Sequence, residues 1–263
     1  MQAFAYQQPT SLADAQKAAA ASGARYLAGG QSLLPAMKLG LAAPETLVDL
    51  GAIAELKSIS VINGTVTIGA MATHASVAES QAVRDTLPAL ADLAGNIGDR
   101  QVRNRGTIGG SLANNDPAAD YPAAVLGLGA TIHTDRRKIA ADDFFKGLYE
   151  TALAEGEIIT AVSFPIPKKA GWEKFKQPAS RFSLVGVFVS QGPQGVRLAV
   201  TGAGPCAFRV KALEDRLSAS WAPSSCDGVK IDAGGLNSDL HGSAEYRASL
   251  IPVLAKRAVA EAG

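Results

Sequence analysis

The sequence predicts a mixed α and β protein of two domains, the first of which is divided into two lobes. Three features support this prediction: a helix and two strands around a glycine turn in roughly the first 50 residues, a hairpin signal at Asn63-Gly64, and a break at Pro165 and Pro167 after which strands and helices resume. With 263 residues, 47% of them hydrophobic, the chain is long enough to bury a substantial core.

The first lobe begins with a predicted helix, "TSLADAQKAAAASG", that Thr10 or Ser11 would cap and Gly23 would end. "ARYLA" then reads as a strand that enters the glycine turn of "YLAGGQSLLPAMK", whose end could open a second helix. "TLVDL" follows as another strand. This length and order resemble a βαβ unit.

The second lobe opens with two alternating runs in "SISVINGTVTIGA", joined by the Asn63-Gly64 pair that is typical of a tight hairpin. A helical pattern follows from Thr73, a suitable cap, to about Gly95, and Pro88 is expected to start a new helix within it. Residues 95–124 are rich in Gly, Asn, Asp and Pro, so we predict one long functional loop there.

The remaining segments complete the two domains. "GATIHT" and "EIITAVSFPIP" are predicted strands that flank an acidic turn, "AADDFF", and "KKAG" is predicted to belong to a linker. Beyond it we expect a strand pair in "RFSLVGVFVS" and "GVRLAVTGAG", a helix in "RVKALEDRL", and a last helix capped by Ser243 and kinked or restarted at Pro252. The predicted domains are residues 1–166, with lobes at about 1–55 and 56–166, and residues 171–263.

Composition narrows the classes of function. Lys and Arg number 25 against 24 Asp and Glu, and the chain has no dense basic run, which argues against nucleic-acid binding. Cys206 and Cys226 are too few to ligate an iron–sulfur cluster, and the three histidines show no metal-ligand spacing. No leader-like or membrane-length apolar run is visible, so a cytoplasmic protein without a membrane span is expected.

The first glycine turn, Gly29-Gly30-Gln31-Ser32, has three readings. It could be an ordinary tight turn, or it could hold a phosphate, because glycines allow close backbone approach and free amides at a helix start favour an anion. A Rossmann fingerprint would place Asp49 on a ribose, but the glycine spacing is wrong and Pro35 lies where the helix should run.

A second turn, in "RNRGTIGGSLANNDPAADYP", places Thr107, Gly109, Gly110 and Ser111 in one segment with Asp120. Two such turns suit a ligand with two polar ends, such as a diphosphate joined to a polyhydroxy chain, for which a carboxylate can act as acceptor. The alternative is local: Asp116 and Asp120 would only cap turns before the prolines that follow them.

Five motifs in this order, "AGGQSLLPAMKL", "RNRGTIGGSLANNDPAADYPA", "KFKQPASRFSLVGV", "AVTGAGPCAFR" and "DLHGSAEYR", resemble the FAD-binding medium subunit of the molybdenum hydroxylases, the carbon monoxide dehydrogenase and xanthine dehydrogenase family. The resemblance covers nearly the whole chain. It implies an α+β fold: a two-lobed FAD-binding domain of the vanillyl alcohol oxidase-like (PCMH) type, with FAD extended between the lobes, and a smaller C-terminal α+β domain.

The resemblance also implies which residues touch FAD. The diphosphate would be wrapped by Tyr26, Leu27, Ala28, Gly29, Gly30, Gln31, Ser32 and Leu33, and the second wall would be formed by Thr107, Ile108, Gly109, Gly110 and Ser111. Asp120 would accept hydrogen bonds from the ribityl hydroxyls or fix the loop beside them, and Ile97 and Ile159 would pack against the rings. Lys176 matches a basic residue near the flavin, and Phe182 stands where related subunits often carry a tyrosine.

The implied function is electron transfer within a multi-subunit oxidoreductase. A large partner would carry the molybdopterin cofactor, a small partner would carry two [2Fe–2S] clusters, and this chain's FAD would pass electrons to an external acceptor. A dimer of heterotrimers is the expected assembly, and no catalytic residue or metal ligand is expected on this chain. Two alternatives are a flavin-less binding or assembly protein of the same fold, and a self-contained flavin oxidase, which the lack of a visible acid–base set disfavours.

Overall fold

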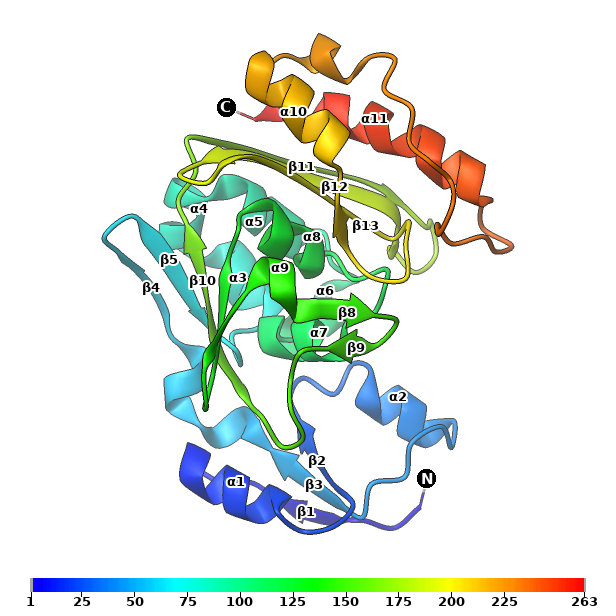
Figure 1. Cartoon of the computed structure of the whole chain (residues 1–263). Helices are drawn as coiled ribbons and strands as arrows, with labels where there is room; N and C mark the ends of the chain where they lie inside the picture. The colour runs from blue at the N-terminus through cyan, green and yellow to red at the C-terminus, as the bar shows by residue number, and fades with distance from the viewer. Residues whose placement is uncertain (1, 263) are drawn as a thin grey trace.

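The computed structural model of the chain describes residues 2–262 and contains three main sheets, which follow one another along the molecule in Figure 1. The first is a three-stranded parallel sheet of order β1-β3-β2, the second a five-stranded sheet of order β4-β5-β10-β6-β7, and the third a four-stranded sheet of order β11-β12-β13-β14. A short hairpin of β8 and β9 projects near the middle of the molecule. The fold is therefore the mixed α and β architecture that the sequence predicts.

The first lobe is close to its prediction. Its elements are β1 (Ala5–Gln7), α1 (Leu12–Ala19), β2 (Ala24–Leu27), α2 (Leu33–Lys38), β3 (Thr46–Asp49) and the short 3₁₀ turns η1 (Leu50–Ala52) and η2 (Ala54–Lys57). Of the two candidate caps, Ser11 is the one used, since its hydroxyl accepts a hydrogen bond from the Asp14 amide at 3.1 Å. Asp49 caps η1 through the Gly51 amide at 2.8 Å, which is a local role and not that of a ribose-binding acid.

The second lobe begins with the predicted hairpin. It comprises β4 (Ile59–Ile62) and β5 (Thr65–Gly69), followed by α3 (His74–Glu79), α4 (Gln81–Thr86) and α5 (Pro88–Gly95). Asn63 and Gly64 both have positive φ, 50° and 74°, as the tight turn requires. Thr73 caps α3 in a capping box and Pro88 opens α5, so the sequence predictions for both are confirmed.

The prediction of one long loop at residues 95–124 is wrong, because three helices lie there. They are α6 (Arg100–Arg105), α7 (Ile108–Asn114) and α8 (Tyr121–Gly127). The polar and glycine residues that suggested a loop are helix ends: the Asp99 carboxylate accepts from the Val102 amide at 2.8 Å, Thr107 accepts from the Gly110 amide at 3.1 Å, and Asn115 ends α7 with φ of 44°. Each helix is too short to show a clear apolar period.

The rest of the second lobe closes the five-stranded sheet. Its elements are β6 (Thr131–Thr134), β7 (Lys138–Ala140), α9 (Ala141–Phe144), β8 (Phe145–Gly147), β9 (Glu150–Thr151) and β10 (Ile159–Pro165). The predicted acidic turn is thus a one-turn helix. Strand β10 lies between β5 and β6, so it joins the predicted hairpin to the later strands.

The third sheet follows after only three connecting residues. Its elements are β11 (Lys169–Lys176), β12 (Ser183–Gly192), β13 (Gly195–Thr201), β14 (Phe208–Arg209), α10 (Lys211–Ala219), η3 (Pro223–Cys226) and α11 (Ala244–Glu261). Most of the predicted linker "KKAG" therefore belongs to β11, a strand that the sequence analysis did not predict. The final helix begins after Ser243 as expected and continues through Pro252.

Both faces of the third sheet are covered, which explains the continuous buried run in β12. Its outer face, with Val185, Val187 and Val189, packs against α10 and α11. Its inner face contributes Trp172 and Phe188 to the core of the second lobe. The predicted domain boundary at residues 166–171 stays a prediction. One hydrophobic core contains residues from both sides of this boundary. No helix within residues 2–262 is both long and apolar enough to cross a membrane.

Candidate functional site

A cavity of about 830 Å³ lies where the first lobe meets the second, and the loop between β11 and β12 reaches its edge. This volume falls in the range of roughly 300–1,000 Å³ that is usual for small-molecule and cofactor sites. Most of the residues predicted to contact a ligand line it: Tyr26, Leu27, Ala28, Gly29, Gly30, Gln31, Ser32, Leu33, Ile97, Thr107, Gly109, Gly110, Ser111, Asp120, Ile159 and Phe182. Residues distant in sequence thus share one cavity.

The two glycine turns touch each other through their backbones. A Cβ atom on Gly29 would lie 2.7 Å from both the Arg105 carbonyl carbon and the Gly106 Cα, and closer still to the Arg105 carbonyl oxygen. On the second turn, a Cβ on Gly109 would meet the Cβ of Ala70 at 2.5 Å. The glycines at these two positions are therefore required by packing between segments of the wall.

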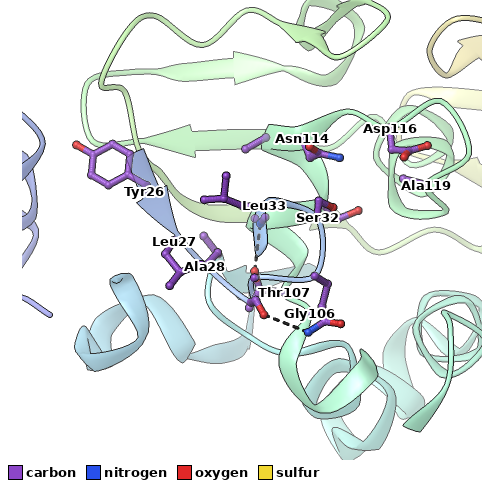
Figure 2. A pocket seen from close by; sticks show the side chains of 18 of the residues that line it. Tyr26, Leu27, Ala28, Ser32, Leu33, Gly106, Thr107, Asn114, Asp116 and Ala119 are labelled. Carbon is purple, nitrogen blue, oxygen red and sulfur yellow. Dashed lines mark hydrogen bonds between the residues drawn. The ribbon is translucent and has the colours of Figure 1, made fainter. Parts of the chain in front are cut away.

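Gly30 has a different requirement. Its φ of 72° lies in the left-handed region, which glycine adopts without the steric cost that a side chain brings. This conformation turns the chain from β2 toward α2. Ser32, at the N-cap position of α2, makes no capping hydrogen bond through its side chain. In Figure 2 Ser32 and Leu33 are seen between Thr107 and Asn114 of the second turn.

Thr107 shapes the second turn as the cap of α7. Its Oγ1 accepts from the Gly110 amide at 3.1 Å, and the side chain is buried. The bond fixes the start of α7 beside the cavity, where Gly109, Gly110 and Ser111 follow. The amides of Ile108, Gly109, Gly110 and Ser111 all donate within the chain, so the second turn offers the hydroxyl of Ser111 to a ligand. Hydroxyl donors of this kind can bind an anionic group without lysines.

The two aspartates of the site differ in role. Asp116 accepts from the Ala118 amide at 2.9 Å, so for this residue the turn-capping alternative is confirmed. Asp120 makes no capping bond at the start of α8, so for Asp120 that alternative is wrong. Its carboxylate accepts instead from the ammonium of Lys174 at 2.6 Å and from the hydroxyl of Ser183 at 2.7 Å.

The buried pair of Asp120 and Lys174 sets the charge at this edge of the cavity. Burial raises the pKa of the Asp120 carboxyl, while the charge of Lys174 and the hydrogen bonds from Lys174 and Ser183 oppose that rise. Both side chains are about 5% exposed or less. The carboxylate therefore enters the cavity wall as half of an ion pair.

An apolar portion of the cavity wall comes from three separate elements. Ile97 follows α5, Ile159 begins β10, and Phe182 ends the loop before β12. Phe182 is 51% exposed and lines the cavity, so its ring is free to cover a flat ligand.

Two predicted residues are not brought to the cavity. The Ile108 side chain is fully buried in the core of the second lobe, and its amide donates to the Ala72 carbonyl at 3.1 Å. Lys176 is exposed at the end of β11 and does not line the cavity. The lysine that reaches the site is Lys174, two residues earlier.

The sequence analysis missed three residues that line the cavity, His74, Arg181 and Asn114. It also missed Lys174, which pairs with the lining residue Asp120. Burial and, to a smaller extent, the charge of Arg103 together lower the pKa of the His74 imidazole to about 4. Its Nδ1 has no hydrogen-bond partner within residues 2–262. One sequence signal was available for Lys174: alternation from the buried Trp172 places it on the inner face of the strand.

Metal ligation is not suggested by the side chains of residues 2–262, which contain no group of three or more His, Cys, Asp or Glu that could hold an ion. Cys206 and Cys226 are both free thiols.

Comparison with known proteins agrees with this geometry. A family profile described as the FAD binding domain in molybdopterin dehydrogenase matches residues 2–167. The nicotine 6-hydroxylase medium subunit of Paenarthrobacter nicotinovorans is 38% identical over 99% of this chain and 98% of its own length. Among solved structures, carbon monoxide dehydrogenase from Hydrogenophaga pseudoflava has a TM-score of 0.89 at 34% identity, covering 98% of this chain and 96% of that one. Quinoline 2-oxidoreductase from Pseudomonas putida 86 has a TM-score of 0.88 at 32% identity, covering 99% and 96%.

Proposed function

Because the chain belongs to the family of FAD-binding medium subunits of molybdenum hydroxylases, we propose that it is the electron-transfer subunit of such a complex. When bound, FAD would accept electrons from [2Fe–2S] clusters on a partner and donate them to an external acceptor. The protein's part is to bind the cofactor, orient it and exclude water.

The observation that carries this proposal is the closure of the two glycine turns on each other beside a cavity of cofactor size. We assign the diphosphate to the turn from Tyr26 to Leu33 and to the hydroxyl of Ser111 at the start of α7. Backbone amides held in place by the rest of the fold stabilise an anion at little reorganisation cost. The Ser32 hydroxyl, which makes no capping hydrogen bond to α2, is the side-chain donor we assign to a phosphate oxygen.

The other parts of the cofactor fit the remaining walls. Ile97, Ile159 and Phe182 provide apolar surface for an aromatic ring system. Asp120 keeps acceptor capacity on its carboxylate beyond the two bonds it makes, so it can take a hydrogen bond from a sugar-alcohol hydroxyl. Lys176 is left out of this assignment because it lies away from the cavity.

Partner subunits follow from what this chain lacks and from the names of its relatives. Its two cysteines cannot ligate two [2Fe–2S] clusters, and two of its relatives are named as a medium subunit and a medium chain. We therefore propose a large subunit with the molybdopterin cofactor and a small iron–sulfur subunit, assembled as a dimer of heterotrimers in the cytoplasm. Relatives named for nicotine and for carbon monoxide share the length of this chain, which supports placing substrate choice on the large subunit.

Two measurements test the proposal. The chain carries an affinity tag and is purified from its native cells under mild conditions, and the co-purifying chains are identified by mass spectrometry. Flavin is quantified after the purified protein is denatured. We expect about one FAD per chain, a visible flavin band that bleaches on reduction, and both partners. Partners without any flavin, together with no FAD binding by the isolated chain, would instead identify a flavin-less assembly protein.

A further inference from the structure

We propose that Lys174 is a positioning residue of the cofactor site, which fixes Asp120 and the loop at residues 177–182 as a third wall of the cavity. The inference rests on the proposed function for the identity of the ligand. The contacts that Lys174 makes with Asp120, Asn96 and Arg181, here called the Lys174 clamp, lie within this chain. The clamp can therefore be tested with and without FAD.

The Lys174 ammonium uses all three of its donors. It donates to Asp120 Oδ2 at 2.6 Å, to the carbonyl oxygen of Asn96 at 3.0 Å, and to the carbonyl oxygen of Arg181 at 3.0 Å. A buried ammonium is stable only when paired and hydrogen-bonded, and these three acceptors meet that condition. The side chain is 5% exposed, so water contributes little to its solvation.

Each of the three acceptors adjoins a different part of the cavity. Asn96 ends α5 and is followed by Ile97 and Gly98, which both line the cavity. Asp120 opens α8, and Arg181 precedes Phe182 in the loop between β11 and β12. One side chain from the third sheet therefore joins two segments of the second lobe to a loop of its own sheet.

The loop needs such a clamp because its backbone is strained. Arg181 has a φ of 62°, in the left-handed region that is unfavourable for a residue with a side chain. Its amide donates to the Gln177 carbonyl at 2.9 Å, and its guanidinium reaches the Gly98 carbonyl at 3.1 Å. Together with the bond from Lys174, these contacts hold the Arg181–Phe182 end of the loop against the second lobe.

Lys174 also balances charge where an anionic ligand is expected. Asp120 is 5% exposed and lines the cavity, so an unpaired carboxylate there would repel a diphosphate cofactor. Besides Lys174, the Asp120 carboxylate accepts a hydrogen bond from the neutral hydroxyl of Ser183. Lys174 is the positive charge that compensates it.

The experiment uses the full chain and four variants: Lys174→Met, Asp120→Asn, the double variant of both, and Lys169→Met as control, because Lys169 is an exposed lysine on the same strand. Two quantities are measured, the dissociation constant for FAD and the rate of tryptic cleavage after Arg181 without FAD, followed by mass spectrometry. For Lys174→Met we expect at least a tenfold higher dissociation constant and faster cleavage at Arg181, whereas Lys169→Met should match the parent chain.

The double variant separates charge from anchoring. Removing the unpaired carboxylate should restore part of the FAD affinity, but cleavage at Arg181 should stay fast because no donor reaches its carbonyl. If Lys174→Met does not fold, the double variant compared with Asp120→Asn alone gives the same information. Parental FAD affinity and parental cleavage in either Lys174 variant would overturn the proposal. A parent chain that binds no FAD would refute the proposed function, while the cleavage rates would still test the clamp.

Discussion

Substitution of Gly29 by alanine tests the contact on which the cavity depends. The added methyl would lie 2.7 Å from the Arg105 carbonyl carbon and from the Gly106 Cα, which are backbone atoms that cannot rotate away. Overpacking of this kind costs about 1–3 kcal/mol. The overlap is relieved most easily if the two turns move apart, and closing them again would then reduce the free energy gained on FAD binding. At about 1.4 kcal/mol per factor of ten, the dissociation constant should rise by about 5- to 150-fold.

The assay is a titration of the apoprotein with FAD, followed by quenching of flavin fluorescence, with thermal unfolding recorded in parallel. The matched control is Gly192→Ala, because a Cβ at Gly192 would meet its nearest neighbours at an ordinary 3.6 Å. We expect the control to bind FAD as the parent does, and Gly29→Ala to unfold about 2–12 °C earlier. A Gly29→Ala variant with parental FAD affinity would show that the contact between the turns does not shape the binding site.

Two further predictions concern acid stability in separate pH windows. Burial lowers the pKa of His74 to about 4 from its usual 6.5, so between these pH values His74 is protonated in the unfolded chain but not in the folded chain. The free energy of unfolding should therefore fall as the pH is lowered from about 6.5 to 4. Urea unfolding should show that the free energy of unfolding of His74→Phe falls less across that pH range than that of the parent chain. An equal fall in both would exclude His74 as its source. Hydrogen bonds from Arg137 lower the pKa of Glu157 to about 2, so this carboxylate stabilises the fold above about pH 4.5 and stops doing so as the pH falls toward 2. Glu157→Gln should be less stable than the parent at neutral pH and show a flatter decline below about pH 4.5; equal declines would contradict the assignment.

Local signals in the sequence succeeded where one or two residues determine the backbone. Asn63-Gly64 fixed a hairpin, and Thr73 and Pro88 marked helix starts, because each acts through its own side chain or ring. The same logic failed at residues 95–124, where capping residues stand so close together that they resemble a loop. Asp99 and Thr107 are separated by one six-residue helix, which is shorter than the window in which a helical period becomes visible.

The choice between Lys174 and Lys176 shows why site residues are harder to predict than elements. Both lysines lie on β11, and alternation along a regular strand would give them the same face. The pairing of β11 with β12 changes register between Phe175 and Lys176, so the alternation cannot be carried from one lysine to the other. Only Lys174 lies beneath α5 and α8, where Asn96 and Asp120 accept its hydrogen bonds.

The cavity extends past the segment that the family profile matches. The matched profile ends at residue 167, yet Arg181 and Phe182 line the cavity and Lys174 holds them there. The same sheet places Trp172 and Phe188 in the core of the second lobe, so its inner face supports α5, which Ile97 follows, and α8, which Asp120 precedes. Two walls of the cavity come from glycine turns that sequence patterns reveal. The third depends on tertiary packing of a strand: alternation can place Lys174 on its inner face, but only the packing of α5 and α8 brings Asn96 and Asp120 to it.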